Sequence, residues 1–132
     1  MNFLLDTDII IYLLNDTYPE LQKKLSSIPE NEISISSITV AELYFGAYNS
    51  SRVDENIQLL QDLLSELRIL YLDEDSGRIF GKIKADLKKR GEIINDSDLF
   101  IASIAIRNGI RLVTNNVRHF SRVEGLKIEN WT

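Results

Sequence analysis

The stretch MNFLLDTDI, residues 1–9, decides the fold of this chain. Phe3–Leu5 is a short apolar run with the composition of a strand that is buried on both faces. Asp6 and Asp8 follow it directly, and a helical pattern continues over Ile9–Leu14. In parallel sheets, ligands bind beyond the carboxyl ends of the strands. The two acids therefore stand where chemistry is expected.

Strand and helix patterns alternate along the rest of the chain, without an internal repeat or a low-complexity tract. Further strands are predicted at Ile33–Ser36, Arg68–Leu72, Arg111–Thr114 and Leu126–Ile128. Helices are predicted at Tyr18–Ile28, from about Thr39 to Tyr48, along the face that carries Ile57, Leu60, Leu64 and Leu67, at Ser76–Arg90, and from Leu99 to near Gly109. The alternation predicts one α/β domain over residues 1–132, in which helices flank both faces of a parallel central sheet.

The composition narrows the chemistry that this domain can use. The chain has 132 residues, of which 44% are hydrophobic and 27% charged, as is ordinary for one globular domain. No Cys is present, which excludes disulfides, thiol nucleophiles and Cys-ligated zinc, and the single His excludes a His-rich metal site. The lack of Cys and of a basic leader favours a cytoplasmic protein. The longest apolar run, LFIASIAI at Leu99–Ile106, is too short to span a bilayer, so no membrane partner is expected.

The charge balance restricts how the protein could meet a polyanion. Its net charge is -5, with 15 Lys and Arg against 20 Asp and Glu. Such a surface repels nucleic acid overall. If the substrate is a polyanion, a cation must therefore stand between it and the protein.

Other polar groups also follow predicted strands or begin predicted helices. Glu42 lies in SSITVAELYFGA, residues 36–47, and Asp96 and Asp98 lie in INDSDLFIASIA, residues 94–105. Thr114 and Asn116 lie in LVTNN, residues 112–116. All of them are expected at the same edge of the sheet.

Each acid also has a purely structural explanation. Asp6 can cap the helix that follows it, because a short acid satisfies free backbone N–H groups at a helix start. Thr39-x-x-Glu42 fits a capping box, in which the Glu side chain folds back to the cap residue. Asp96 is the predicted cap of its helix, which leaves Asp98 on the first turn and pointing to the edge of the sheet.

Taken together, Asp6, Glu42 and Asp98 would bring three carboxylates from distant parts of the chain to one edge of one sheet. Their repulsion costs free energy unless a cation is bound or a carboxyl group is protonated. Oxygen ligands without Cys or His select a hard ion such as Mg²⁺ or Mn²⁺. Such an ion can bind phosphodiester oxygens and lower the pKa of a water, so no His base is needed. The sequence therefore predicts a metal-dependent nuclease.

The same motifs resemble those of PIN-domain ribonucleases of the VapC toxin type, found in bacterial and archaeal toxin–antitoxin pairs. The resemblance covers nearly the whole chain: it includes FLLDTDIIIYLL (3–14), SSITVAELYFGA (36–47), the segment from INDSD to VEGL (94–126) and KIENW (127–131). It implies a parallel α/β sandwich, Mg²⁺ or Mn²⁺ as cofactor and cleavage of RNA by a metal-activated water. It also implies a homodimer and a small VapB-like antitoxin that blocks the site.

Carried over residue by residue, the resemblance assigns catalysis and metal binding to Asp6, Glu42 and Asp98. It assigns supporting roles to Thr7 and Thr114, which match polar neighbours of the family acids.

Two positions depart from the family pattern. Asp8 stands where many members have Asn, and Asn116 stands where many have Asp. Whether Asp8 faces the metal and whether a second ion binds therefore stay open. Asp96 is a further supporting candidate, and Arg118 and His119 in the predicted loop VRHF are candidates for phosphate contact.

Two alternatives come from other classes of protein. Asp6-x-Asp8 after a strand also resembles the motif of haloacid-dehalogenase-like phosphatases, in which the first Asp is a phosphorylated nucleophile and the second a general acid. That alternative leaves Glu42 unexplained, and the chain has no room for the usual cap insertion. A catalytically degenerate PIN fold, used only for binding, is the second alternative, and Asn116 is the one feature that favours it.

Overall fold

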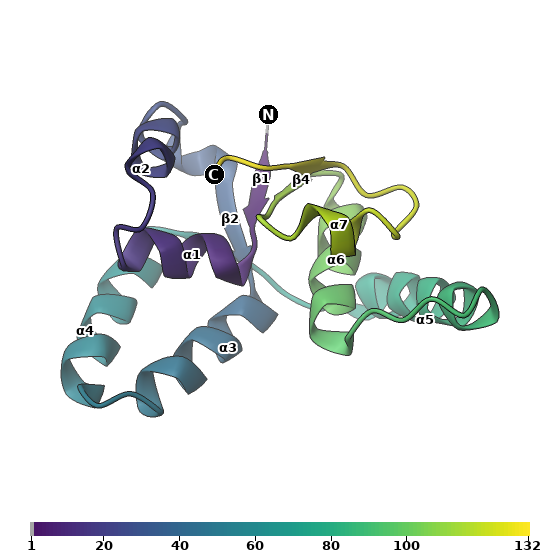
Figure 1. The fold of residues 1–132 in the computed structure, drawn as a ribbon, viewed down its shortest axis with the longest axis horizontal. Coiled ribbons are helices and arrows are strands. Elements are labelled where there is room, and N and C mark those ends of the chain that lie inside the picture. The colour runs from purple at the N-terminus through teal and green to yellow at the C-terminus, as the bar shows by residue number, and fades with distance from the viewer. Residues whose placement is uncertain (1) are drawn as a thin grey trace.

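The computed structural model describes residues 2–132, and in these residues five short strands form one parallel sheet at the centre of the molecule (Figure 1). The strands are β1 (Phe3–Leu5), β2 (Ile33–Ser36), β3 (Arg68–Leu70), β4 (Arg111–Val113) and β5 (Ile128–Glu129). Their order in the sheet is β3-β2-β1-β4-β5, and every neighbouring pair is parallel. The prediction of an α/β fold with a parallel central sheet is confirmed.

Among residues 2–132, seven α-helices and one 3₁₀ helix connect the strands. They are α1 (Thr7–Leu14), α2 (Pro19–Ser26), the 3₁₀ helix η1 (Glu30–Glu32), α3 (Ser37–Tyr48), α4 (Val53–Leu64), α5 (Glu74–Lys89), α6 (Asp96–Asn108) and α7 (Val117–Phe120). None of the helices in this part of the chain combines the length and the apolar composition that a membrane span needs.

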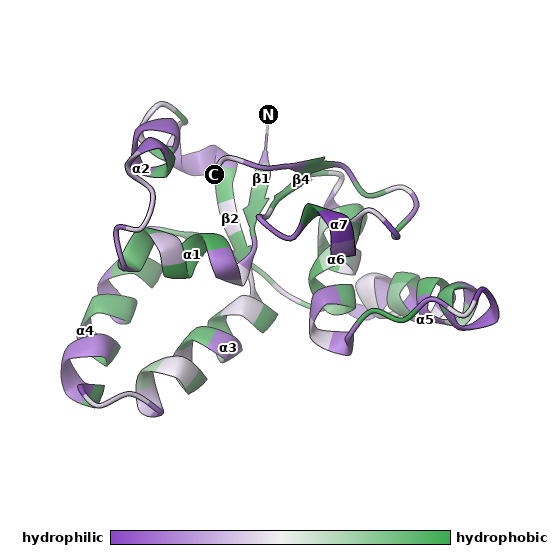
Figure 2. Cartoon of the chain, in the orientation of Figure 1, coloured by the Kyte–Doolittle hydropathy of each residue, from purple (hydrophilic) through white to green (hydrophobic). Residues whose placement is uncertain are grey.

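The sheet is buried on both faces, because successive side chains of a strand point to opposite sides. Phe3 and Leu5 of β1 pack with residues of α1, α2, α3 and α4, whereas Leu4 packs with residues of α5, α6 and α7. Leu112 and Val113 of β4 divide between the two sides in the same way. Figure 2 shows hydrophobic residues, in green, along the strands and on the helices next to them. Helices therefore cover both faces, as the sequence predicts.

The strand order of the sheet reverses between β1 and β4. This strand lies between β2, which follows it in the sequence, and β4, which is reached only after β3. The connections leaving β1 and β4 therefore diverge, and this is the point at which parallel sheets bind ligands. Asp6 follows β1 here, and Thr114 follows β4.

The structure differs from the sequence-based prediction near the C-terminus. Val117–Phe120, predicted as a loop, forms the short helix α7. The Phe120 N–H donates to the Asn116 carbonyl oxygen at 3.2 Å, and the Phe120 ring is fully buried. Four residues are too few to form a helix by propensity, so burial of the aromatic ring holds this turn. The last strand lies at Ile128–Glu129 and not at Leu126–Ile128.

Candidate active site

Asp6 is the residue around which the site is built. It caps α1, because its Oδ1 accepts a hydrogen bond from the Thr7 N–H at 2.8 Å. Its Oδ2 accepts a second hydrogen bond from Thr114 Oγ1, also at 2.8 Å. The Asp6 residue is only 5% exposed. It is therefore both a helix cap and a buried carboxylate between the ends of β1 and β4.

Asp8 lies on the first turn of α1 and faces the same threonine. Its Oδ2 accepts a hydrogen bond from the Asn115 N–H at 3.1 Å and lies 3.5 Å from Thr114 Oγ1. Its Oδ1 is buried and has no hydrogen-bond partner within residues 2–132. A buried acceptor without a donor costs free energy. Asp8 therefore leaves one oxygen that a cation could satisfy.

Asp98 reaches the site from α6. Asn95 caps this helix: its Oδ1 accepts from the Asp98 N–H at 2.9 Å, and its Nδ2 donates to Asp98 Oδ2 at 3.0 Å. His119 Nε2, from α7, lies 3.4 Å from the same Oδ2. No hydrogen bond in the described part of the chain engages Asp98 Oδ1. The Asp98 carboxylate is thus held through one oxygen, and the other is available.

Glu42 does not close a capping box, so that prediction is wrong. The cap of α3 is Ser36, whose Oγ accepts from the Thr39 N–H at 3.0 Å, so Glu42 stands too far along the helix to reach back to its start. Instead, Glu42 Oε1 accepts from Thr7 Oγ1 at 2.7 Å, and Thr7 Oγ1 lies 3.0 Å from Thr39 Oγ1. Glu42 is therefore tied to the residue next to Asp6.

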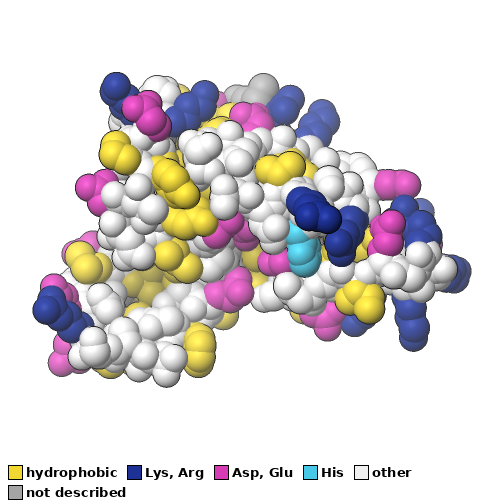
Figure 3. All heavy atoms as spheres, viewed as in Figure 1, with side chains coloured by type: hydrophobic (Ala, Val, Ile, Leu, Met, Phe, Trp, Pro, Cys, Tyr) yellow, Lys and Arg dark blue, Asp and Glu magenta, His cyan; other side chains and the backbone are white. Residues whose placement is uncertain are grey.

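Acidic side chains gather in one hollow of the surface, and the charges of Asp8 and Asp98 act on Asp6. Figure 3 shows acidic side chains, in magenta, between the side of the molecule that holds α1 and α3 and the side that holds α6 and α7. Burial and then the charge of Asp8 raise the pKa of Asp6 to about 7, and the charge of Asp98 adds to the rise. Hydrogen bonds from Thr114 and Thr7 offset only part of it. Burial also raises the pKa of Asp8. The hollow therefore favours the uptake of a proton or a cation.

The donor atoms suit a hard divalent cation. The groups that meet in the hollow are carboxylates, which Mg²⁺ and Mn²⁺ prefer, and the buried Asp8 Oδ1 has no other partner. Within residues 2–132, no three His, Cys, Asp or Glu side chains are close enough together to enclose an ion by themselves. Mg²⁺ commonly keeps several waters and uses one or two carboxylates together with substrate phosphate. The residues present fit such an ion.

Comparisons with known proteins agree with this geometry. The family model of the PIN domain matches residues 3–126. The chain belongs to the PIN-domain family. This PIN domain is 42% identical to ribonuclease VapC2 of Haemophilus influenzae over 133 residues, which cover 99% of this chain and 98% of that protein. It is 33% identical over 131 residues to the tRNA(fMet)-specific endonuclease VapC of Salmonella typhimurium, with 99% and 98% covered.

The fold of this PIN domain is also that of a solved structure. It matches a chain in the crystal structure of VapBC2 from Rickettsia felis bound to a DNA fragment from their promoter, with a TM-score of 0.94 and 35% identity over 100% of both chains. The protein is thus a PIN-domain nuclease of the VapC type. The haloacid-dehalogenase-like alternative is wrong, since the family match spans the segments that hold Asp6, Glu42 and Asp98.

Two of the supporting candidates lie away from the carboxylates of this PIN domain. The prediction that Asp96 caps α6 is wrong, because Asn95 is the N-cap residue of this helix. The Asp96 side chain is 55% exposed and pairs with Lys84 at 2.9 Å. Asn116 is exposed, and within residues 2–132 only its backbone N–H makes a hydrogen bond near the site, to Thr114 Oγ1 at 3.0 Å. Asp96 is therefore turned to solvent, and the Asn116 side chain is at most at the rim.

Sequence reasoning missed two contacts of Asp98. The spacing Asn95-x-x-Asp98 is typical of a helix cap and could have indicated Asn95. Nothing in the sequence could have indicated that His119 contacts Asp98, since the two residues meet only where α7 packs beside α6.

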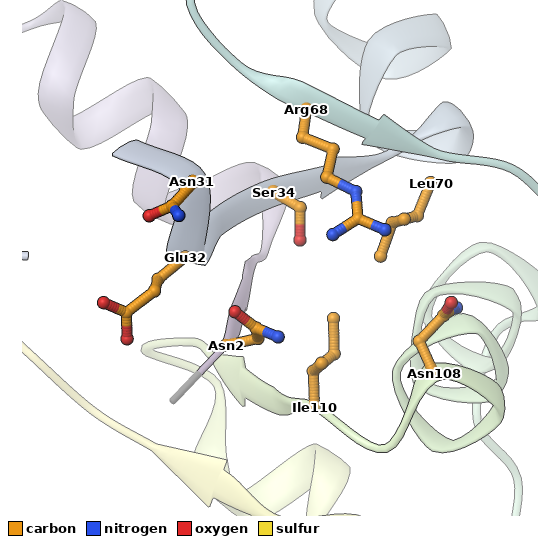
Figure 4. A pocket seen from close by; sticks show the side chains of 8 residues that line it. All are labelled: Asn2, Asn31, Glu32, Ser34, Arg68, Leu70, Asn108 and Ile110. Atoms are coloured by element: carbon orange, nitrogen blue, oxygen red, sulfur yellow. The ribbon is translucent and has the colours of Figure 1, made fainter. Parts of the chain in front are cut away.

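Cavities also lie outside the acidic hollow of the PIN domain, among them a groove and a pocket that bear on the position of the site. A largely apolar groove of about 350 Å³ runs beside Glu42 between α1, α3 and α4. A smaller pocket of about 80 Å³ lies at the amino ends of the strands (Figure 4) and is lined by Asn2, Asn31, Glu32, Ser34, Arg68, Leu70, Asn108 and Ile110. Because it opens at the opposite end of the sheet from Asp6, it is not part of the active site.

Proposed function

We propose that this PIN domain is a divalent-metal-dependent endoribonuclease that acts as the toxin of a toxin–antitoxin pair. The observation that carries the proposal is the meeting of Asp6, Asp8 and Asp98, with Glu42 tied to them through Thr7. Three separate segments of the chain supply these acids, the charges of Asp8 and Asp98 act against that of Asp6, and Asp8 Oδ1 and Asp98 Oδ1 have no hydrogen-bond partner within residues 2–132. Holding a cation against an anionic substrate is the use that this arrangement supports best.

The role of each residue follows from its contacts. Asp6 and Asp98 are the residues that would hold Mg²⁺ or Mn²⁺, with Asp8 as a further oxygen donor. When bound, the ion supplies a Lewis acid that neutralises phosphodiester charge and activates a water. Thr7 and Thr114 fix both oxygens of Asp6 and so keep its carboxylate from rotating.

Glu42 is the general base in this proposal. Because Thr7 engages Oε1, Glu42 is oriented and its Oε2 can accept the proton of the attacking water. As the water oxygen bonds to phosphorus, the bond from phosphorus to the leaving oxygen breaks, and the leaving oxygen takes up a proton from solvent water. One carboxylate thus serves as a base in a site that needs no histidine for this step.

The partners belong to the same proposal. The groove beside Glu42 is lined by Ile11, Leu14 and Leu59, which are all partly exposed, and it could receive an apolar antitoxin segment next to the acids. The solved structure of VapBC2 from Rickettsia felis supports such a partner. Phe45 and Tyr48, exposed on α3, could pack against a second copy in a homodimer. We expect the protein to act in the cytoplasm, where its RNA substrate is made.

Cleavage of RNA by the purified, antitoxin-free protein tests the proposal. Total RNA is incubated with the protein and Mg²⁺, Mn²⁺ or excess chelator, and the cut ends are mapped. We expect cleavage with either ion, none with chelator, and none from Asp98→Asn purified in the same way, which excludes a contaminating nuclease. Equal cleavage in chelator contradicts the metal dependence, and no cleavage in any condition favours a degenerate binding module.

Transfer RNA is the substrate to examine first. The Salmonella typhimurium relative, 33% identical, is named a tRNA(fMet)-specific endonuclease. Messenger and ribosomal RNA are compared in the same reaction, because the choice of RNA depends on local shape and unpaired bases that the acids do not read.

A further inference from the structure

The carboxylate of Asp98 is held from one side only. Its Oδ2 contacts Asn95 Nδ2 at 3.0 Å and His119 Nε2 at 3.4 Å, whereas its Oδ1 has no partner within the described residues. Asp6 differs, because threonine and backbone donors engage both of its oxygens. The direction in which Asp98 Oδ1 points therefore depends on Asn95 and His119.

Packing against Phe120 holds the His119 ring beside Asp98. Its ring lies against Phe120, with 5.8 Å between the ring centroids, and Phe120 is fully buried and anchors α7. The His119 side chain is 25% exposed, yet its Nε2 is shielded from water and forms no aligned hydrogen bond within residues 2–132. Asp98 Oδ2 is the acceptor that the fold places beside this nitrogen. Closing the last few tenths of an ångström would satisfy a buried N–H that otherwise costs free energy.

We propose that His119, together with Asn95, is a positioning residue of the nuclease site. The two side chains hold Asp98 Oδ2, so that Oδ1 is directed to the cation and does not rotate toward solvent. This inference rests on the proposed function, since it presupposes that Asp98 holds a divalent ion. Groups that orient a metal ligand in this way typically contribute 10- to 100-fold to metal affinity or activity.

Three substitutions separate the contacts. His119→Leu removes the Nε2 donor and keeps an apolar side chain against Phe120. His119→Gln restores a donor at a similar reach. Asn95→Ser keeps an oxygen that can cap the Asp98 N–H, because Ser is a good cap residue, but it has no amide to donate to Oδ2. Arg118→Gln, on the same short helix and without a salt bridge to an acid within residues 2–132, is the matched control for changes in α7.

The first measurement is calorimetric titration of Mn²⁺ into each metal-free protein without RNA. We expect His119→Leu and Asn95→Ser each to weaken Mn²⁺ binding by about 10-fold or more. His119→Gln should recover most of the loss, and Arg118→Gln should bind Mn²⁺ as the unaltered protein does. Thermal unfolding of the metal-free proteins accompanies the titration, because a merely structural His119 would lower the melting temperature without changing Mn²⁺ affinity in the fraction that is folded.

The second measurement separates positioning from contact with the substrate. At saturating Mn²⁺, a positioning role predicts a KM for RNA that changes less than twofold in His119→Leu. An unchanged Mn²⁺ affinity with a raised KM would overturn the inference, since His119 would then contact phosphate. Failure of Gln to recover the affinity would also overturn it. If the unaltered protein binds no Mn²⁺, the proposed function itself fails, and this outcome is distinct from both.

Discussion

Replacing Asp6 by Asn should make the metal-free protein more stable while removing its activity. Burial and the charge of Asp8 raise the pKa of Asp6 from 3.8 to about 7 in the folded protein. Each unit of pKa difference between the folded and unfolded states corresponds to 1.36 kcal/mol, so the ionised Asp6 destabilises the fold by up to about 4 kcal/mol above pH 7. Asn carries no charge and escapes this cost.

The local contacts allow the substitution. Asn is as good a helix cap as Asp, so its oxygen can still accept from the Thr7 N–H. Its amide can donate to Thr114 Oγ1, because a hydroxyl oxygen can accept as well as donate. A role in capping alone therefore predicts almost no change in stability, whereas repulsion in the site predicts a gain.

The pH dependence gives the sign of the effect. Because the folded pKa of Asp6 lies above the unfolded value of 3.8, the folded state keeps its proton longer than the unfolded state does. The free energy of unfolding therefore falls as pH rises from about 4 to about 7 and is level above pH 7 as far as Asp6 is concerned. Asp8 has a raised pKa as well, so Asp6→Asn should show a shallower slope but still a slope.

Urea unfolding followed by the fluorescence of Trp131, which packs edge-on against Phe3, measures both quantities. Without metal, we expect Asp6→Asn to be more stable than the unaltered protein by roughly 1 to 4 kcal/mol at pH 8.5, and by about 2 kcal/mol less at pH 5.5. Saturating Mn²⁺ should narrow or reverse the difference, since only the unaltered protein gains from binding. A variant that is less stable at pH 8.5 without metal would refute the reasoning.

Three further expectations can be checked with the same proteins. Asp98→Asn and Glu42→Gln should each nearly abolish RNA cleavage with no large loss in melting temperature, whereas substantial melting losses would indicate that these acids serve mainly to hold the fold. Asn116→Asp should lower the Mn²⁺ concentration for half-maximal cleavage, since a carboxylate at the rim strengthens a second ion, and Asn116→Ala should reduce the rate less than Asp98→Asn; an unchanged Mn²⁺ dependence would remove Asn116 from the rim. Expression of the protein alone should arrest bacterial growth, and co-expression of its antitoxin should restore it; harmless overexpression of a protein that cleaves RNA in vitro would contradict the role as a toxin.

The order of the elements and the main acids could be predicted from local patterns. The run Phe3–Leu5 before Asp6 indicates a buried strand that is followed by a candidate site residue. Such a pattern can be recognised because apolar periodicity and strand ends are properties of neighbouring residues. The long apolar helix after Asp98 is indicated in the same way. Asp6, Glu42 and Asp98 could be proposed together because acids that follow strands, at or near the starts of helices, are expected at one edge of a parallel sheet.

Only the tertiary structure decided which side chains touch. Whether Thr39 or Ser36 caps α3 depends on an offset of three residues, and whether Asp96 or Asn95 caps α6 depends on an offset of one. Residues of these types are all good helix caps, so the sequence does not choose between them. The helix α7 exists because the buried Phe120 holds it.

The contact of His119 with Asp98 and the bond from Thr7 to Glu42 join residues from separate elements. Their distances are set by how α7 packs beside α6 and how α1 packs beside α3. The sequence by itself determined the α/β order and indicated the acids that we propose for the site. The packing of helices around β1 decided which oxygens are held and which remain available, because hydrogen bonds between distant residues depend on the position of whole elements and leave no trace in local sequence.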